Sequence, residues 1–191
     1  EQSTSRTEAQ IELDLAKLAA FGYVTPDKPR SRIADEFRIL KRPLIANASS
    51  GRAVPIKHGN LVMVTSAVPG EGKTFSAINL AMSIAMELDK TVLLVDADVA
   101  RPSLPTRLGL PESRGLLDLL DNKDLDMKDV LLRTNVEKLS ILTSGTPHAQ
   151  STELLASTAM NRLEGSPSPV PKTSNRTPSK RASPPVVATH R

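Results

Sequence analysis

The chain has 191 residues, with 25 basic and 21 acidic side chains and a formal net charge of +4. It contains no Cys, which excludes disulfides and thiolate metal sites, and its three His are far apart in sequence. Five basic and no acidic residues fall in 165–191, so the rest of the chain is close to neutral. With only three Phe and one Tyr available for stacking, we expect no nucleic-acid surface.

Residues 1–59 are expected to form a helical segment and a linker. Apolar spacing predicts helices over 7–20 and over 31–42, the second limited by Pro43, and a loop over 46–59. The polar side of the second helix carries charges at i, i+3 and i+6, namely Asp35, Arg38 and Lys41. From composition alone, a solvated charged face explains these three residues.

A glycine-rich turn follows the apolar run Leu61–Val64, which we interpret as a parallel strand covered on both faces. Gly70 and Gly72 allow successive N–H groups to point at one anion. Lys73 supplies a charge for the terminal phosphates of a nucleotide, and the Thr74 hydroxyl can ligate Mg²⁺. A helix is expected from 73 to about 88, so that its positive end faces the phosphates.

Two carboxylates follow the next apolar strand, which is predicted over 91–95. Asp96 and Asp98 would lie at the edge of the sheet where ligands gather in open α/β folds. Carboxylates beside a phosphate loop can hold Mg²⁺ or accept a proton. The alternative is a simple turn at the end of a strand.

The remaining sequence predicts short helices, one more strand and a tail. Helices are expected over 104–108, 115–120, 125–133 and 150–164, and a strand over 139–143. Residues 165–191 are rich in Pro and lack a periodic apolar pattern, so we expect them to be disordered. The prediction is an α/β P-loop fold with a mostly parallel sheet flanked by helices, incomplete, with its P-loop domain over 60–164.

Three segments carry a resemblance to a known family: SAVPGEGKTFSAINLAMSIA, VDADVARPSLPTRLGL and STELLASTAMNRL. They resemble the cytoplasmic domain of bacterial tyrosine autokinases, in particular the exosortase-associated subgroup linked to exopolysaccharide export. The resemblance implies that ATP and Mg²⁺ bind at the loop formed by Pro69, Gly70, Glu71, Gly72, Lys73 and Thr74. It further implies that Lys73, Asp96 and Asp98 are catalytic, with Asp96 as the base, and that Thr74 and Asp98 hold the metal.

The same resemblance implies partners for the chain. In the family, a Glu-x-x-Arg-x-x-Arg helix docks one subunit on the next in a ring, and the matching positions here are Asp35, Arg38 and Lys41. The expected location is cytoplasmic, at the inner membrane, beside a polysaccharide co-polymerase. The related ParA- and MinD-like ATPases usually carry an extra lysine early in the loop, which Ser66–Gly70 lacks. A regulatory ATPase or a non-catalytic fragment remain the alternatives to a kinase.

The chain departs from the family pattern after residue 164. Ala182 stands where the family has the aspartate of Asp-Ser-Pro-Pro, no strand is predicted before Ser183–Pro185, and the only tyrosine is Tyr23. The start at Glu1 rather than Met indicates a fragment or a processed piece. Because the sequence after Gly165 is rich in Pro, Ser and Arg and contains no acid, we also expect that truncation or a frameshift removed the second half of the domain. An open apolar edge beside the phosphate-loop strand, weak nucleotide binding and marginal stability would follow.

Overall fold

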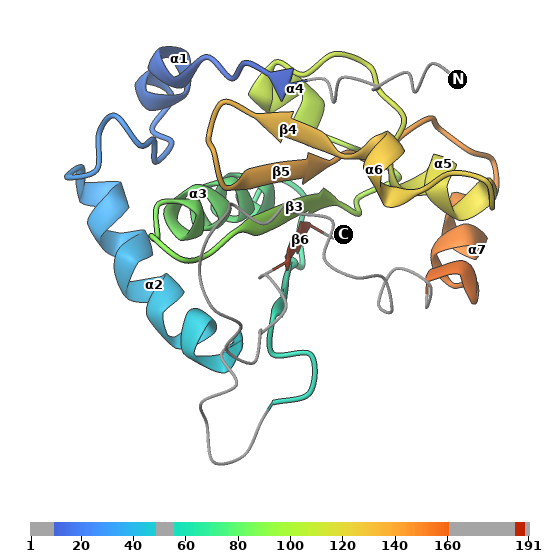
Figure 1. The fold of residues 1–191 in the computed structure, drawn as a ribbon, viewed down its shortest axis with the longest axis horizontal. Coiled ribbons are helices and arrows are strands. Elements are labelled where there is room, and N and C mark those ends of the chain that lie inside the picture. The colour runs from blue at the N-terminus through green and yellow to red at the C-terminus, as the bar shows by residue number, and fades with distance from the viewer. Residues whose placement is uncertain (1–9, 49–55, 161–185, 190–191) are drawn as a thin grey trace, which may run out of the picture.

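The computed structural model describes residues 10–48, 56–160 and 186–189. Its centre is a six-stranded sheet with the order β1-β4-β5-β3-β6-β2 (Figure 1). All neighbouring strands are parallel except β4 and β5. The strands are β1 (Gln10–Ile11), β2 (Leu61–Val64), β3 (Val92–Asp96), β4 (Leu132–Thr134), β5 (Leu139–Leu142) and β6 (Val186–Thr189). The mostly parallel α/β architecture predicted from the sequence is therefore confirmed.

Helices cover both faces of this sheet (Figure 1). They are α1 (Leu15–Ala20), α2 (Arg32–Ala48), α3 (Lys73–Ala85), α4 (Leu104–Leu108), α5 (Leu116–Asp121), α6 (Met127–Val130) and α7 (Ser151–Leu155). The larger core joins α2 and α3 to one face, and the smaller core joins α5, α6 and α7 to the other. None of the helices in the described ranges combines the length and the apolar character needed to cross a bilayer.

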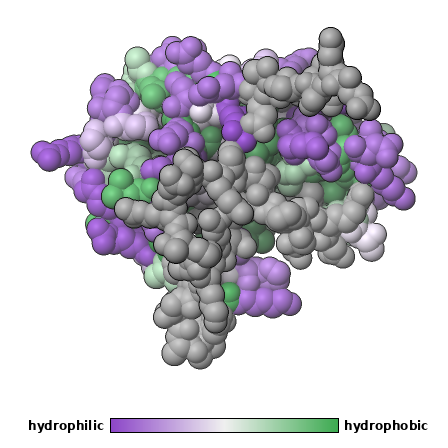
Figure 2. All heavy atoms as spheres, in the orientation of Figure 1, coloured by the Kyte–Doolittle hydropathy of each residue, from purple (hydrophilic) through white to green (hydrophobic). Residues whose placement is uncertain are grey.

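The fully buried strand β3 shows why this sequence forms a two-sided sheet. Val92 and Leu94 pack into the larger core, whereas Leu93 and Val95 pack into the smaller one. Successive side chains of a strand point to opposite faces, so an uninterrupted apolar run suits a strand with helices on both sides. On the face drawn in Figure 2, the described surface is mostly hydrophilic and apolar residues show only in smaller patches.

The N-terminal segment begins with a strand where a helix was expected. Gln10–Ile11 pairs with β4, and α1 starts only at Leu15, where the Asp14 carboxylate accepts the Lys17 N–H at 2.9 Å. The helix predicted over 125–133 is also wrong in its second half, because Leu132–Thr134 forms β4. Both segments are short, and the pairing of β1 with β4 outweighs their local helical spacing.

Helix α2 continues through Pro43 to Ala48, so the expected end near residue 42 is wrong. A proline inside a helix removes one backbone hydrogen bond and costs about 3 kcal/mol. Residues on both sides of the proline, including Phe37, Leu44 and Ile45, pack against the larger core. This burial offsets the loss and keeps the helix intact.

The tail predicted to be disordered contributes a strand. Val186–Thr189 lies between β2 and β3 and pairs with both, and Val187 is fully buried. Four residues with two adjacent valines can fill this gap because each backbone group finds a partner on either side. Residues 165–185 and 190–191, which include Ala182 and Ser183–Pro185, lie outside the described ranges.

The prediction of an open edge beside the phosphate-loop strand β2 is therefore wrong on the side where β6 pairs with it. Among the described strands, β2 is one of the two outer ones, and Leu61 and Met63 on one of its faces are exposed, Met63 to 63%. The interpretation of Leu61–Val64 as a strand covered on both faces is thus also wrong. Its apolar run resembles that of a buried strand, but an outer strand can carry the same residues.

Candidate nucleotide-binding site

The turn between β2 and α3 has the shape of a phosphate-binding loop. Gly70 and Gly72 have φ angles of 90° and 91°, in the left-handed region that a residue with a Cβ rarely adopts. Gly72 caps α3, and its carbonyl accepts the Ser76 N–H at 2.8 Å. The Glu71 carboxylate accepts the Val68 N–H at 3.1 Å, which closes the turn on itself. The first turn of α3 therefore faces the concave side of the loop.

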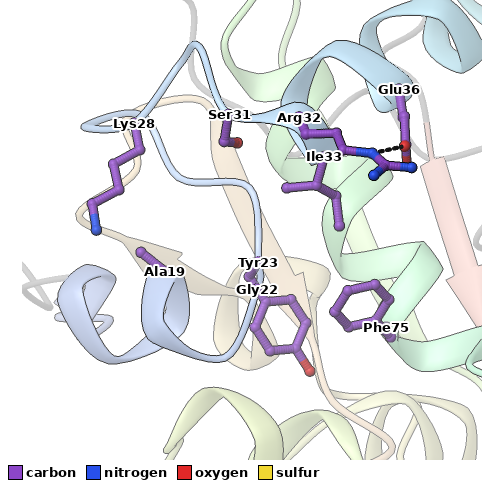
Figure 3. Close-up of a pocket in the computed structure, with 9 residues that line it drawn as sticks. All are labelled: Ala19, Gly22, Tyr23, Lys28, Ser31, Arg32, Ile33, Glu36 and Phe75. Atoms are coloured by element: carbon purple, nitrogen blue, oxygen red, sulfur yellow. Dashed lines mark hydrogen bonds and ion pairs between the residues drawn. The ribbon is translucent and has the colours of Figure 1, made fainter.

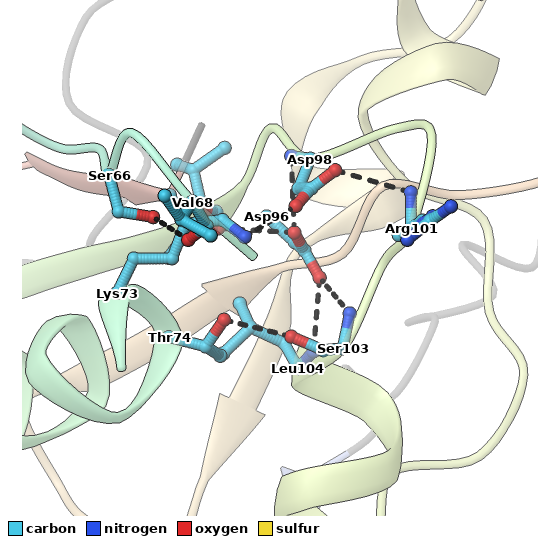
Figure 4. Close-up of polar contacts among 11 residues, drawn as sticks. Ser66, Val68, Lys73, Thr74, Asp96, Asp98, Arg101, Ser103 and Leu104 are labelled. Atoms are coloured by element: carbon cyan, nitrogen blue, oxygen red, sulfur yellow. Dashed lines mark hydrogen bonds and ion pairs between the residues drawn. The ribbon is translucent and has the colours of Figure 1, made fainter. Parts of the chain in front are cut away.

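Lys73 and Thr74 reach from α3 towards the segment that follows β3 (Figure 4). The Lys73 ammonium lies 2.9 Å from a carboxylate oxygen of Asp98, and both side chains are largely buried. The Thr74 hydroxyl is 2.9 Å from the Ser103 hydroxyl. Two strand-to-helix connections, separated by β6 in the sheet, thus meet in one cleft.

Asp96 lies behind this cleft and only 1% of it is exposed. One carboxylate oxygen accepts the backbone N–H groups of Ser103 and Leu104 at 3.1 and 3.0 Å. The other accepts the Asp98 N–H at 3.3 Å and the Thr189 hydroxyl at 3.1 Å. Burial raises the pKa of Asp96, and these four donors only partly counteract it. With both oxygens engaged by donors of the chain itself, Asp96 fixes the start of α4.

Six of the predicted site residues line the cleft: Pro69, Gly70, Gly72, Lys73, Thr74 and Asp98. Glu71 and Asp96 do not. The structure adds Ser66, Arg101, Ser103 and Arg107 among others to the lining. Arg101 and Ser103 follow the two aspartates closely in sequence. The predicted end of the strand could therefore have identified them as site residues. Arg107 has no such signal, because it reaches the cleft only through the placement of α4.

The charged residues of α2 do not share one surface. Arg38 pairs with Asp35 at 2.6 Å, and both side chains are substantially exposed. Lys41 instead is 5% exposed and contacts Glu87 at 2.8 Å and the Ser83 carbonyl. The expectation that Lys41 lies on the polar side of this helix is wrong, because the side chain points at the end of α3.

Oxygen ligands suited to Mg²⁺ are present in the cleft. The Thr74 hydroxyl and the Asp98 carboxylate are hard donors of the kind that this ion prefers, and they come from the two connections that meet there. Within the described ranges, no group of three or more His, Cys, Asp or Glu forms a separate metal cluster. The donor set thus fits a magnesium ion that keeps several waters or phosphate oxygens as further ligands.

A glycine-rich loop between a parallel strand and a helix, with its lysine facing an acidic strand end, defines the class of P-loop α/β proteins. Comparison with known proteins refines this class, although no protein-family model matches the chain. The chain is 37% identical to the tyrosine-protein kinase YwqD of Bacillus subtilis over 136 residues, which cover 71% of the chain and 54% of the relative. It is also 29% identical over 142 residues to the succinoglycan biosynthesis transport protein ExoP of Rhizobium meliloti, covering 73% of the chain and 17% of ExoP.

The fold has a solved counterpart in the kinase domain of the Escherichia coli tyrosine kinase ETK. The TM-score is 0.65 at 22% identity, and the match covers all of this chain and 63% of the ETK chain. In sequence the chain is thus similar to bacterial tyrosine-protein kinases, and in fold it is similar to the kinase domain of ETK. It spans about half the length of the Bacillus relative.

Proposed function

We propose that the chain binds ATP with Mg²⁺ and transfers phosphate to protein tyrosine, in the service of exopolysaccharide synthesis or export. The observation that carries this proposal is the meeting of Lys73, Thr74 and Asp98 in one cleft at the phosphate loop. The kinase relatives support tyrosine as the acceptor, and the name of ExoP supports the link to polysaccharide.

The loop residues would bind the triphosphate. Backbone N–H groups from Gly70 to Thr74 would donate hydrogen bonds to its phosphates, whereas Pro69 has no N–H to donate. The Lys73 ammonium, which pairs with Asp98 at 2.9 Å, would move its contact to phosphate oxygens. That exchange frees the Asp98 carboxylate for a second role.

Asp98 and Asp96 have different roles in the proposed reaction. Thr74 and Asp98 would hold Mg²⁺, which when bound offsets negative charge on the phosphate oxygens. Asp98 is also the carboxylate in the cleft that can accept the proton of the tyrosine hydroxyl. Asp96 was expected to be this base, but its buried carboxylate is engaged by four donors of the chain itself. We therefore assign Asp96 to positioning of α4.

Transfer is expected to be slower than in family members that carry the aspartate of Asp-Ser-Pro-Pro. The described end of β6 presents the Thr189 hydroxyl to Asp96, rather than a carboxylate to the cleft. Catalysis of phosphate transfer depends on placement and charge, so one fewer acidic group lowers the rate more than it lowers binding. Tyr23, the one tyrosine of the given sequence, is buried and is therefore a poor acceptor in this fold.

Partners follow from the same proposal. The exposed Asp35–Arg38 pair on α2 is the part of the family's docking motif that another subunit can reach. A ring of such subunits would act in the cytoplasm beside a membrane polysaccharide co-polymerase. Lys41 is left out of this surface because its charge is already paired inside the chain.

The test is incubation with Mg-ATP and a tyrosine-containing polymer, followed by detection of both phosphotyrosine and free phosphate. We expect phosphotyrosine from the parent chain and none from Lys73→Met, which lacks the ammonium. Free phosphate without phosphotyrosine would instead identify a regulatory ATPase. Absence of both products would overturn the proposed transfer reaction.

A further inference from the structure

A second arginine on the wall of the phosphate-loop cleft has no part in the roles assigned so far. We infer that Arg107 binds a phosphate group of the nucleotide, and that Tyr23 holds its guanidinium in place. This inference rests on the proposed binding of Mg-ATP and adds a residue to that same site. Arg107 is exposed and lines the cleft together with Lys73 and Arg101.

The charge of Arg107 is available to a ligand. In the described part of the chain, no ion pair involves Arg107, whereas Lys73 is paired with Asp98. Among the described residues, its guanidinium makes one hydrogen bond, from Nη1 to the Tyr23 hydroxyl at 3.4 Å. A guanidinium has five N–H donors in a planar fork, so the others can bind two oxygens of one phosphate.

The helix that carries Arg107 is tied to the loop. Asp96 binds the N–H groups of Ser103 and Leu104 at the start of α4, and Ser103 contacts the Thr74 hydroxyl. The Arg107 N–H then donates to the Ser103 carbonyl at 3.1 Å. The backbone of Arg107 is thus fixed to the residues that meet the phosphates.

The side chain is held from the other direction by Tyr23. This tyrosine is 6% exposed, and its ring packs beside Phe75 with centroids 5.0 Å apart (Figure 3). Phe75 directly follows Thr74, and its carbonyl accepts the Asn79 amide at 2.9 Å. The same Asn79 side chain accepts the Val24 N–H at 2.6 Å. The Tyr23 hydroxyl therefore has a fixed position beside α3, from which it can hold the Arg107 guanidinium at the cleft.

The experiment is calorimetric titration of the full chain with Mg-ATP and, separately, with inorganic triphosphate. We expect Arg107→Ala to weaken both ligands by about tenfold or more, as is usual when a hydrogen bond to a charged group is lost. Arg107→Lys should recover part of this loss, since it keeps the charge without the fork. Arg42→Ala, at an exposed arginine of α2, is the matched control and should bind like the parent.

Tyr23→Phe removes only the hydroxyl and tests positioning. We expect about twofold to fourfold weaker binding of both ligands in the parent background, and no further effect when Arg107 is already Ala. Equal binding by the parent and Arg107→Ala would overturn the inference alone. Weakening for Mg-ATP but not for triphosphate would reject phosphate as the contact, and additive effects would reject the role of Tyr23. If the parent binds neither ligand, the proposed nucleotide site itself fails.

Discussion

At the scale of single residues, two aspartates two positions apart have different environments and different roles. Asp96 is enclosed by backbone and hydroxyl donors, whereas Asp98 faces the Lys73 ammonium. The sequence places both at the end of a strand, but it does not say which of the two faces a ligand. Which aspartate faces a ligand depends on where α4 starts, because the N–H groups of Ser103 and Leu104 at its start donate to Asp96.

The asparagine variants of these aspartates should separate the two roles. Asp96→Asn leaves donors such as the Ser103 or Leu104 N–H without an acceptor, and we expect it to lower the unfolding free energy by about 1–3 kcal/mol. Asp98→Asn keeps the size of the side chain that faces Lys73 but removes its negative charge. It should abolish phosphate transfer with a smaller loss of stability than Asp96→Asn. Urea denaturation and the phosphotyrosine assay measure the two effects. The reverse pattern would contradict the assignment.

A pH effect is expected from Asp118. Burial by itself would raise the pKa of this carboxyl, but hydrogen bonds from Thr146 and Gly115 outweigh burial and lower the pKa. A lowered pKa means that Asp118 adds stability above its unfolded pKa of about 3.9, and that this stability is lost as the pH falls through the folded value.

The corresponding variant is Asp118→Asn. At pH 6 it should be about 1–2 kcal/mol less stable than the parent, because the charged acceptor for two backbone N–H groups is lost. The difference should shrink as the pH is lowered below 4, and urea unfolding at a series of pH values measures it. A difference that stays constant with pH would show that the charge of Asp118 is not responsible.

At the scale of elements, packing between α2 and α3 determines where α2 ends and where the Lys41 side chain lies. Its apolar spacing predicted a helix, and a helix is present, but Pro43 did not end it and Lys41 is not on its polar face. Both differences have one origin. The helix lies along α3, where burial outweighs the proline and where the end of α3 offers Glu87 and the Ser83 carbonyl to the lysine.

Substitutions at this contact test it directly. Glu87→Ala leaves a buried ammonium with only the Ser83 carbonyl, so we expect a loss of about 1–3 kcal/mol in unfolding free energy. Lys41→Met replaces the charge by an apolar chain of similar length and should change stability by less than about 1 kcal/mol. Thermal and urea unfolding give both values. A change in oligomeric state on Lys41→Met, with stability intact, would restore the docking role for this residue.

At the scale of the whole molecule, the order of the sheet could be predicted only in part. The strand–helix–strand unit from β2 to β3 follows from apolar runs on either side of an amphipathic helix. The insertion of β6 between those strands does not follow from the sequence near it, because a run of three apolar residues in a Pro-rich segment carries no periodic signal. The short strands β1 and β4 were missed for a similar reason, since each is defined mainly by its partner.

The place of β6 predicts that a single charge in it disrupts the fold. Val187 is fully buried between β2 and β3, so Val187→Asp would bury an unpaired carboxylate and should cost more than about 3 kcal/mol. Val187→Ile, which keeps an apolar β-branched side chain, is the control. We expect that only Val187→Asp loses the cooperative thermal transition. An unchanged transition would mean that the tail lies outside the sheet, as the sequence had suggested.

The central claim is that the loop after β2 and the acidic end of β3 form one site for a nucleoside triphosphate. Calorimetric titration of the parent chain and of Lys73→Met with Mg-ATP tests it most directly, because the lysine joins the two halves of the cleft. We predict saturable one-site binding by the parent, and at least about tenfold weaker binding by the variant. Identical binding by the two proteins, or no binding by the parent, would contradict the claim.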